Sequence, residues 1–531
     1  MKKILTLIIS LFIIGLCSCK TESDSEGLKI QINYDQPVKS ISPYIFGVND
    51  RADLEIVHPK SIRLGGNRMT AYNWETNKSN AGADWYNQSD NYMTQSIRSH
   101  YRQCSGGPAL NMVDDALENN IPYTLLTLQM AGYVANKDGE MTVDNDLDSN
   151  DWCKIVNRKN GEFEIFPDTT DNVVYTDEYL NYLDYLIGKS DSETGIKAYA
   201  LDNEPALWQH THSLIQREPI KAEDLIAKSI DLASTVKDFD SGAEIFGPSL
   251  FGYSAYCSLG SDWPLLQIKS AYRYNWFIDY YLDKMKEAEE TYGKRLLDVL
   301  DLHYYTEAKG ACGKRTCEHF DNDDCIKARI NAVRSLYDAD YKEKSWIMDT
   351  GAKFFPLLPN IKNSIDTFYP GTKLGFTEYN FGGGKHISGA IAQSDFLGLL
   401  AQQEVYFASI WAFENSEYQF AAINMYTNYD SNGSYFGDKL VPLTSEDDYT
   451  VSAFAAKNEE DGKFHIILNN KNIHEKTTVK INLENPASEI EMYTLDNSGP
   501  EIHKAEPVYS IKKGILTIEL EPLTVNHLII E

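Results

Sequence analysis

The stretch YALDNEPALW, residues 199–208, decides how the rest of the chain is interpreted. Asn203 and Glu204 stand side by side in it, directly after an apolar run with the composition of a buried strand. A second stretch, KLGFTEYNFGGG (373–384), places Glu378 after a similar run, followed by glycines that allow a backbone to approach a ligand closely. Two glutamates at two strand ends are the minimum that cleavage of a glycosidic bond with retention of configuration requires.

Eight short apolar runs alternate with longer helical stretches between residue 43 and about residue 430. This alternation is typical of a parallel sheet covered by helices, and eight strands are the number that closes a (β/α)8 barrel. We therefore predict an α/β fold with a TIM barrel over residues 43–430. In chain order the predicted strands are YIFGV, SIRLGG, YTLLTLQ, KAYALDN, EIFGPS, LLDVLDLHYY, KLGFTEY and YFASIWAF.

Beyond residue 430 the pattern changes to β-strands alone, which predicts a β-sandwich over residues 431–531. One further strand-like stretch, GLKIQINYD, precedes the barrel, and we assign residues 28–42 to it and its connection. A lone strand needs a partner, and the sandwich offers one. We expect the two ends of the folded chain to meet in this second, smaller all-β domain.

The chain begins with a basic and then apolar segment, MKKILTLIISLFIIGLCSC, whose apolar part is too short to span a bilayer. Residues 1–18 are typical of a secretory signal peptide. Their end resembles a bacterial lipobox, which implies cleavage before Cys19 and a lipid on that thiol. Residues 19–27 form a polar, acidic tether, so we expect an exported lipoprotein of the outer membrane that faces the cell surface.

The formal net charge of −29 argues against nucleic acid as a partner, because such a field repels phosphate backbones. Neutral polymers remain compatible with this charge. An acidic surface that keeps an exported protein soluble explains the same charge equally well. We expect the protein to be a monomer.

Six cysteines follow the leader region, and an exported protein can form disulfides. Cys312, Cys317 and Cys325 lie close together in the sequence with His319 among them. A zinc site and a disulfide that staples a surface loop are both open. The irregular spacing and the lack of a CxxC pair favour the disulfide.

In a barrel of this kind, the C-terminal ends of the strands face the active site. Glu204 ends the fourth predicted strand and Glu378 the seventh. A carboxylate beside Asn203 has little reason from packing to lie there, so a function explains the two glutamates better. Ion pairing or core packing can also explain the other strand-end groups, which are Arg63, Asn67, His303, Tyr305 and Trp411.

Retaining hydrolysis requires two unlike carboxyl groups and no cofactor. Glu204 fits the general acid, because apolar neighbours raise the pKa of a carboxyl group, and Asn203 can bond the 2-hydroxyl of the sugar. Glu378 fits the nucleophile, which stays ionised when donors lie nearby. Arg63 and the adjacent hydroxyl-bearing residues Thr377 and Tyr379 are the predicted donors.

Three tryptophans lie in polar sequence contexts, NWE, DWY and LWQ. These contexts favour the wall of a solvent-filled cleft over a sealed core, and indole rings in such a wall stack on sugar faces. We therefore predict that Trp74, Trp85 and Trp208 line the substrate cleft.

The sequence resembles glycoside hydrolase family 44, in the clan of (β/α)8 retaining glycosidases whose acid follows an asparagine at strand four and whose nucleophile ends strand seven. The resemblance covers nearly the whole chain beyond the leader. RLGGNRMTAYNWETNKSNAGADWY (63–86) is its most specific segment, whereas NEP is shared by the clan. The other segments are QMAGYVA, YALDNEPALW, GKRLLDVLDLHYYTEA, YPGTKLGFTEYNFGGGKHISGAIAQSDFLG and ASIWAF.

This resemblance implies an endo-acting β-1,4-glucanase that cleaves plant cell-wall polysaccharide such as xyloglucan, or soluble cellulose derivatives. Glu204 would be its acid/base and Glu378 its nucleophile. The same chemistry on β-mannan or xylan stays open as an alternative, as does a surface glycan-binding lipoprotein without turnover.

The family can also carry bound calcium, so a structural calcium is compatible with the resemblance. The run DNDLDSND offers oxygen ligands from Asp144, Asp146 and Asp148, but it lacks the glycine and distal glutamate of an EF-hand loop. A solvated acidic loop is the alternative. The cysteine-containing insert at residues 312–325 departs from the family and lies on the predicted rim of the active site, which leaves the preferred substrate open.

Overall fold

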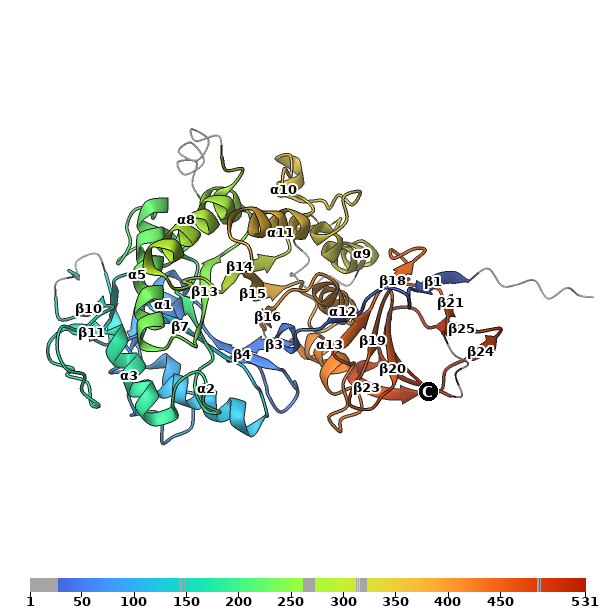
Figure 1. The fold of residues 1–531 in the computed structure, drawn as a ribbon, viewed down its shortest axis with the longest axis horizontal. Helices are drawn as coiled ribbons and strands as arrows, with labels where there is room; N and C mark the ends of the chain where they lie inside the picture. The colour runs from blue at the N-terminus through green and yellow to red at the C-terminus, as the bar shows by residue number, and fades with distance from the viewer. Residues whose placement is uncertain are drawn as a thin grey trace, which may run out of the picture.

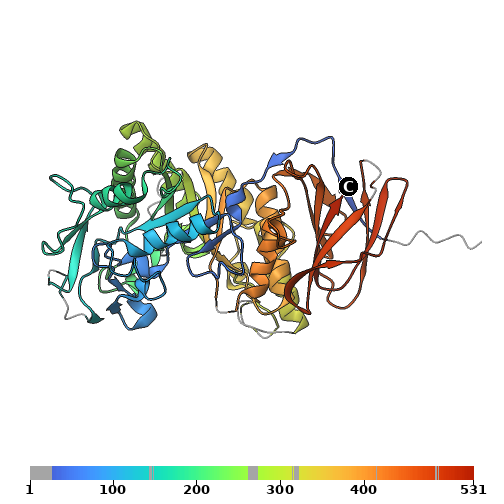
Figure 2. The ribbon, with the colours of Figure 1, turned by 90° about the horizontal axis from the view of Figure 1, so that it is seen from below.

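The computed structural model describes residues 27–142, 146–147, 149–260, 273–311, 313, 315, 322–413, 415–484, 487 and 489–531. It contains a barrel and a smaller all-β body side by side, seen from two directions in Figures 1 and 2. Within these residues no helix is both long enough and apolar enough to cross a bilayer. The predicted signal peptide, Cys19 and most of the tether lie outside the described residues.

Eight parallel strands close into a barrel, and each overlaps one of the eight runs predicted from the sequence. All of these strands are largely buried, because helices cover the outside and side chains fill the inside. The prediction of a TIM barrel is confirmed. The strands, in order around the barrel, are β12 (Ala198–Leu201), β13 (Glu244–Leu250), β14 (Val299–Tyr305), β15 (Lys373–Asn380), β16 (Phe407–Ile410), β3 (Gly47–Asn49), β4 (Ser61–Leu64) and β7 (Thr124–Leu128).

Amphipathic helices surround the barrel, and two of them occupy stretches whose apolar residues recur at helical spacing: α5 (Ala222–Phe239) and α8 (Phe277–Tyr292). The remaining long helices are α2 (Gly107–Glu118), α3 (Thr176–Ile187), α11 (Leu357–Phe368), α12 (Ile387–Gln402) and α13 (Glu417–Thr427). Shorter ones are α1 (Asn67–Thr70), α4 (Trp208–Thr211), α6 (Tyr253–Ser258), α9 (Asp323–Asn331) and α10 (Trp346–Asp349). Single 3-10 turns are η1 (Pro43–Ile45), η2 (Gly82–Trp85), η3 (Tyr92–Thr94), η4 (Pro205–Leu207) and η5 (Ala332–Leu336).

Two small sheets lie on loops of the barrel, and the sequence pattern did not predict them. Their strands are two to five residues long, too short to show an alternating pattern. One sheet joins β5 (Ser79–Asn80), β6 (Gln88–Asp90) and β9 (Gly139–Glu140); the other joins β8 (Tyr133–Ala135), β10 (Trp152–Val156) and β11 (Val173–Tyr175).

The sandwich consists of a five-stranded and a seven-stranded sheet. β1 (Leu28–Ile32) lies between β18 and β21 in the first sheet, and Figure 1 shows this blue strand among the orange and red ones. β2 (Lys39–Ser40) pairs with β17 in the second sheet. The other strands are β17 (Lys439–Val441), β18 (Leu443–Ser445), β19 (Val451–Lys457), β20 (Phe464–Asn470), β21 (Thr477–Asn482), β22 (Ile490–Asp496), β23 (Gly499–Ala505), β24 (Tyr509–Lys512), β25 (Ile515–Leu520) and β26 (Thr524–Ile530).

Helix α12 connects the two bodies, because it packs on the barrel and on the sandwich at once. Every residue from Ile387 to Ala401 is buried, so the helix shows no polar face. Gly398 lets the sandwich approach closely, since a Cβ there would lie 2.3 Å from the ring of Phe454. A fully buried ion pair between Lys471 and Asp395, with 2.6 Å between Nζ and Oδ2, crosses the same contact. The sandwich is therefore a packed support for the barrel.

Candidate active site

The two glutamates singled out in the sequence meet at the C-terminal end of the barrel. Glu204 follows β12, whereas Glu378 and His303 lie near the ends of β15 and β14. One oxygen of each carboxylate and one ring nitrogen of His303 lie within 4.8 Å of one another. Residues far apart in the sequence thus form one compact acidic pair with an imidazole between them.

The backbone turn that presents Glu204 is unusual. Asp202 and Glu204 both have left-handed backbone conformations, with φ of 65° and 44°, which L-residues adopt only when their surroundings enforce it. The buried carboxylate of Asp202 accepts the N–H groups of Asn203, Met130 and Ala131, which ties the turn to the end of β7. Burial raises the pKa of Asp202 to about 6. Sequence analysis missed this supporting role of Asp202.

Glu378 is held as a carboxylate by donors on two other strands, β4 and the adjacent β14. Arg63 donates from Nη1 to Oε1 at 2.7 Å, and Tyr305 donates its hydroxyl to Oε2 at 2.8 Å. Burial alone would raise the pKa of Glu378, but His303 when it is protonated, the charge of Arg63 and the bonds from Arg63 and Tyr305 hold it below its ordinary value. Glu378 is therefore ionised at neutral pH.

Glu204 lies in a contrasting environment. Its Oε1 is 2.9 Å from Nδ1 of His303, and its side chain is 13% exposed, so it is reachable from the cleft. Burial raises the pKa of Glu204 and the negative charge of Glu378 adds to this, against the opposing effects of His303 and Arg63. The pair thus combines a carboxyl group that retains its proton with one that loses it.

Arg63 links four strand ends through its guanidinium group, which is fully buried. Besides Glu378, Nη1 reaches Oδ1 of Asn49 at 3.0 Å and Nη2 reaches Oδ1 of Asn203 at 2.8 Å. The amide of Asn203 in turn donates to Asn67 at 3.1 Å. Arg63, Asn203 and Asn67 therefore belong to the site as predicted positions, and Asn49 joins them without having been predicted.

Two of the three tryptophans predicted in the cleft wall are buried, and the prediction for them is wrong. Trp74 has no exposed surface and stacks on Tyr179 with 4.8 Å between ring centroids. Trp208 is also fully buried and donates its indole N–H to the carbonyl of Asn203 at 3.0 Å. The asparagines beside Trp74 bond within their own loop, so they do not indicate solvent. Trp85 is 62% exposed, at the end of η2.

Tyr379 is a second correction. Its ring is fully buried, and its hydroxyl accepts a bond at 2.6 Å from Gln393 of α12, on the side of β15 that faces the helices. Neighbouring side chains of a strand point to opposite faces, so a tyrosine directly after Glu378 points away from the site. The hydroxyl beside Glu378 comes from Tyr305 on the next strand instead.

Trp411 follows β16 and lies against the active-site loop after β4. A Cβ on Gly66 would lie 2.5 Å from its ring, so glycine is required where the indole crosses the backbone. Gly66 also has φ of 83°, which favours glycine. The partly exposed indole of Trp411 is thus fixed beside Asn67 and can present its free area to a ligand.

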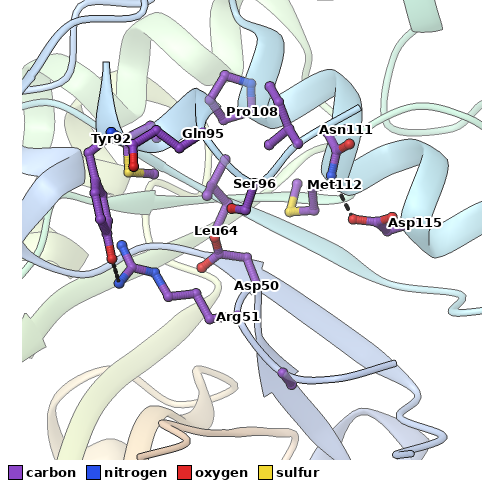
Figure 3. A pocket seen from close by; sticks show the side chains of 13 residues that line it. Asp50, Arg51, Leu64, Tyr92, Gln95, Ser96, Pro108, Asn111, Met112 and Asp115 are labelled. Carbon is purple, nitrogen blue, oxygen red and sulfur yellow. Dashed lines mark hydrogen bonds between the residues drawn. The ribbon is translucent and has the colours of Figure 1, made fainter. Parts of the chain in front are cut away.

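Two cavities differ in their relation to the glutamates. The first, of about 330 Å³, lies beside Glu204 and is lined by aromatic side chains that include Phe251, Tyr253 and Trp346. Arg315, from the cysteine-containing insert, also lines it. The second, of about 540 Å³, is lined by side chains of the β3–β4 loop, η3 and α2; Figure 3 shows Asp50 and Leu64 pointing into it. Neither glutamate lines this second cavity.

Metal binding has little support among the described residues. Among these residues, one cluster of potential metal ligands is compact enough to share an ion, and it consists of Glu204, His303 and Glu378. Arg63 already supplies a positive charge 2.7 Å from Glu378, so the group does not fit a divalent cation. Of the candidate calcium ligands, Asp144 and Asp148 lie outside the described residues, as do Cys312, Cys317 and His319, so the cysteine predictions remain predictions.

Comparisons with known proteins show the family to which the chain is similar. The sequence model described as "Glycoside hydrolase family 44" matches residues 78–308. The chain is 41% identical over 510 residues to Endoglucanase A of Paenibacillus lautus, which covers 94% of this chain and 72% of that protein.

Two solved structures share the whole architecture. The family 44 endoglucanase Cel44A from Clostridium thermocellum is 42% identical, with a TM-score of 0.90 over 95% of this chain and 100% of that one. A family 44 xyloglucanase from Paenibacillus polymyxa is 39% identical, with a TM-score of 0.91 over 95% and 99% of the two chains.

Replacing the buried and the exposed tryptophan separately tests the correction made above. We expect Trp74→Ala to lower the free energy of unfolding by about 3–5 kcal/mol, because it removes a stacked core ring and leaves a cavity. Trp85→Ala should change it by less than about 0.5 kcal/mol, because the ring is mostly exposed. Urea unfolding followed by tryptophan fluorescence measures both. Equal losses of stability would contradict the placement.

Proposed function

The chain belongs to glycoside hydrolase family 44, and we propose that it is an endo-acting enzyme that cleaves β-1,4-glucan backbones by double displacement. The observation that carries this proposal is the convergence of two glutamates with opposite pKa shifts, one oxygen of each lying within 4.8 Å of the other. Retaining glycosidases place their two carboxyl groups about 5–5.5 Å apart, whereas inverting ones need about 6.5–9.5 Å to admit a water molecule. The shorter spacing favours retention.

In the first step, the ionised Glu378 attacks the anomeric carbon while Glu204 transfers its proton to the departing glycosidic oxygen. A glycosyl ester forms on Glu378, and the glycosidic bond breaks. Asn203 accepts a hydrogen bond from Arg63 on its side chain and one from the indole N–H of Trp208 on its carbonyl. Held in this way, it can bond the sugar 2-hydroxyl beside the nucleophile.

In the second step, Glu204 works as a base. Esterification removes the negative charge of Glu378, which is one of the causes that raise the pKa of Glu204. The pKa of Glu204 therefore falls, and its carboxylate can take a proton from water as that water attacks the anomeric carbon. Both steps therefore depend on the difference in pKa between Glu204 and Glu378.

The substrate follows from the relatives and from the shape of the site. Proteins named as endoglucanase and xyloglucanase share this chain's fold and about two-fifths of its residues. Trp411 and the exposed Trp85 offer aromatic faces on which sugar rings can stack. The same mechanism on β-mannan or xylan remains the alternative, because these polymers differ from glucan by single hydroxyl or hydroxymethyl groups. Both carboxylates are in place, which favours an enzyme over a glycan-binding protein without turnover.

Glutamine variants separate the two roles. Glu204→Gln should lower kcat/KM on xyloglucan by about 10²–10⁴-fold, because the leaving oxygen loses its proton donor. It should still form a glycosyl-enzyme from a dinitrophenyl glycoside, whose leaving group needs no proton. Glu378→Gln should abolish turnover of both substrates. Reducing-sugar release, burst kinetics and the anomeric form of the product by NMR report these outcomes.

The control for these variants is Glu501→Gln, at an exposed glutamate of the sandwich. It should behave as the wild type. Near-normal turnover of xyloglucan by Glu204→Gln or Glu378→Gln would show the assignment to be wrong, and release of product with inverted configuration would contradict the double displacement.

We also propose that the 330 Å³ cavity beside Glu204 receives the leaving-group side of the substrate. The acid protonates the departing oxygen, so sugars beyond that oxygen lie on the side of Glu204. Trp346 lines this cavity with its ring edge-to-face on Tyr253, 6.2 Å between centroids, and is 38% exposed. An indole held in this way can support a sugar ring.

Trp346→Ala tests this assignment. We expect a roughly threefold to tenfold loss of kcat/KM on long cello-oligosaccharides, equivalent to one aromatic contact. The transfer of glycosyl groups to added cellobiose should fall in parallel, whereas hydrolysis of the glycosyl-enzyme by water should not change. Phe166→Ala, at an exposed ring that is not in the cavity, is the control. Unchanged transfer in Trp346→Ala would contradict the assignment.

The location of the enzyme is a separate proposal that rests on sequence alone. The lipobox-like ending before Cys19 and the acidic tether support a lipid-anchored protein of the outer membrane that faces the polymer outside the cell. Such a polymer is too large to enter a cell, so an endo-acting enzyme at the surface would be the first to cut it.

Replacing Cys19 tests the anchor. In a bacterial host, the wild type should partition into the detergent phase and incorporate labelled palmitate, because the thioether-linked lipid requires the Cys19 thiol. Cys19→Ser should do neither, and Cys17→Ser should retain both properties. Labelling of the Cys19→Ser protein would contradict the anchor.

A further inference from the structure

A chain of buried hydrogen bonds runs behind the catalytic pair, and the mechanism above does not use it. Nε2 of His303 lies 3.1 Å from Oγ1 of Thr377, and this hydroxyl donates to Oδ2 of Asp301 at 2.9 Å. Asp301 also accepts the hydroxyl of Ser249 at 2.5 Å and the N–H of Thr377 at 3.2 Å. The four side chains have no exposed surface.

The number of protons in this series of hydrogen bonds fixes the tautomer of His303. Asp301 accepts from three donors, and these hydrogen bonds stabilise its carboxylate, whereas burial is the larger effect and raises the pKa of Asp301. Thr377 has a single hydroxyl hydrogen, which it gives to Asp301. Its oxygen therefore accepts from His303, so Nε2 carries a hydrogen. Burial opposes a charge on this ring, but the carboxylates of Glu378 and Glu204 raise the pKa of His303. When the proton between Nδ1 and Glu204 resides on Glu204, the imidazole is neutral and its hydrogen lies on Nε2.

With the proton on Nε2, the other ring nitrogen, Nδ1, carries a lone pair that faces Glu204. Nδ1 lies 2.9 Å from Oε1 of Glu204, so the hydrogen of this contact has to belong to Glu204. Nδ1 also lies 3.4 Å from Oε2 of Glu378, whose negative charge is offset by Arg63 at 2.7 Å. The lone pair on Nδ1 therefore disfavours the ionised form of Glu204 more than that of Glu378. The arrangement stabilises the protonated form of Glu204.

We propose that Asp301 and Thr377 are positioning residues that fix His303 with its proton on Nε2 and thereby keep the acid proton on Glu204. This inference rests on the proposed role of Glu204 as general acid. The effect supplies what a general acid needs near neutral pH, which is a carboxyl group that retains its proton until the leaving oxygen demands it. In the second step, the lone pair on Nδ1 also favours the return of a proton to Glu204.

Other ionisable groups around His303 bear on this inference. Tyr256, on α6, donates its hydroxyl to the carbonyl of His303 and so orients the backbone of that residue without reaching the ring nitrogens. The titratable and charged groups that face His303 from the surrounding elements are Glu204, Glu378, Arg63, Asp301, Tyr305 and Tyr256. Among them, only Glu204 and Glu378 contact Nδ1 in the described part of the chain.

Thr377→Val tests the proposal, because it removes the hydroxyl and keeps the shape. A proton on Nε2 would then be buried without an acceptor, so the neutral ring shifts its proton to Nδ1 and donates to Glu204. Donation to the carboxylate lowers the pKa of Glu204, and the alkaline limb of kcat/KM on xyloglucan should move about half to one unit to lower pH. Thr377→Ser should restore the wild-type limb.

Asp301→Asn provides an independent route to the same change. The amide of asparagine donates to Thr377, whose hydroxyl then turns to Nε2 and again drives the ring proton to Nδ1. The limb should shift in the same direction, and the double variant should shift no further than either single one. Thr127→Val is the matched control, at a buried hydroxyl of β7 that has no hydrogen-bond partner among the residues the structure describes, and it should leave the profile unchanged.

A dinitrophenyl β-cellobioside distinguishes a proton effect from damage to the fold. Its leaving group needs no acid, so Thr377→Val should form the glycosyl-enzyme from it within about twofold of the wild-type rate. An unmoved alkaline limb, a limb that moves to higher pH, or equal losses on both substrates would overturn the proposal. A limb that moves to higher pH would mean that His303 is an imidazolium in the wild type.

Nitrogen-15 NMR of the histidine rings reads the tautomer without any activity, with the signals of His303 assigned by comparison with His303→Gln. The wild type should carry its proton on Nε2, and Thr377→Val on Nδ1. If the wild type hydrolyses no polysaccharide, the proposed function fails while this measurement still decides the tautomer. A wild-type proton on Nδ1 would overturn the inference whatever the activity.

Discussion

Burial of the Arg63 guanidinium is the constraint on which the rest of the site depends. A charge of this size leaves water only where partners replace its hydration, and breaking such a set is costly. Its two terminal nitrogens find Glu378, Asn49 and Asn203, which come from three other strands of the barrel. One side chain therefore fixes the positions of Glu378, Asn203 and Asn49 relative to one another.

The same guanidinium makes the two glutamates unlike. It lies against Glu378 and favours the ionised form there, whereas Glu204 has an imidazole for its neighbour and is raised by burial and by the charge of Glu378. Two identical side chains a few ångströms apart thus titrate differently because one cation sits on one of them. The proposed retaining mechanism uses this difference between Glu204 and Glu378 in both of its steps.

The sandwich contributes to this geometry indirectly. It packs against α12, the helix that follows Glu378 in sequence, through buried apolar contacts and the ion pair of Lys471 with Asp395. Gln393 of the same helix holds the hydroxyl of Tyr379. The strand that carries the nucleophile is therefore braced from behind by a helix whose outer face is covered.

Much of the fold could be predicted from the sequence, because buried parallel strands are nearly continuous apolar runs and the eight of them are separated by recognisable helices. The sequence pattern predicted the sandwich as a whole, but it did not indicate β23 and β24, where no residue is fully buried. At the site, a strand end beside a polar motif was enough to find Glu204, Glu378, Arg63, Asn203 and His303.

The structure alone decided which neighbours face inward. Tyr379 turns away, Trp74 and Trp208 are enclosed, and Thr377 reaches the same histidine as its neighbour Glu378 where the pairing of β14 with β15 shifts register. Sequence determines which chemical groups stand at strand ends, since pattern and composition are local; orientation, pKa and proton position depend on partners from other strands, which only the closed barrel brings together.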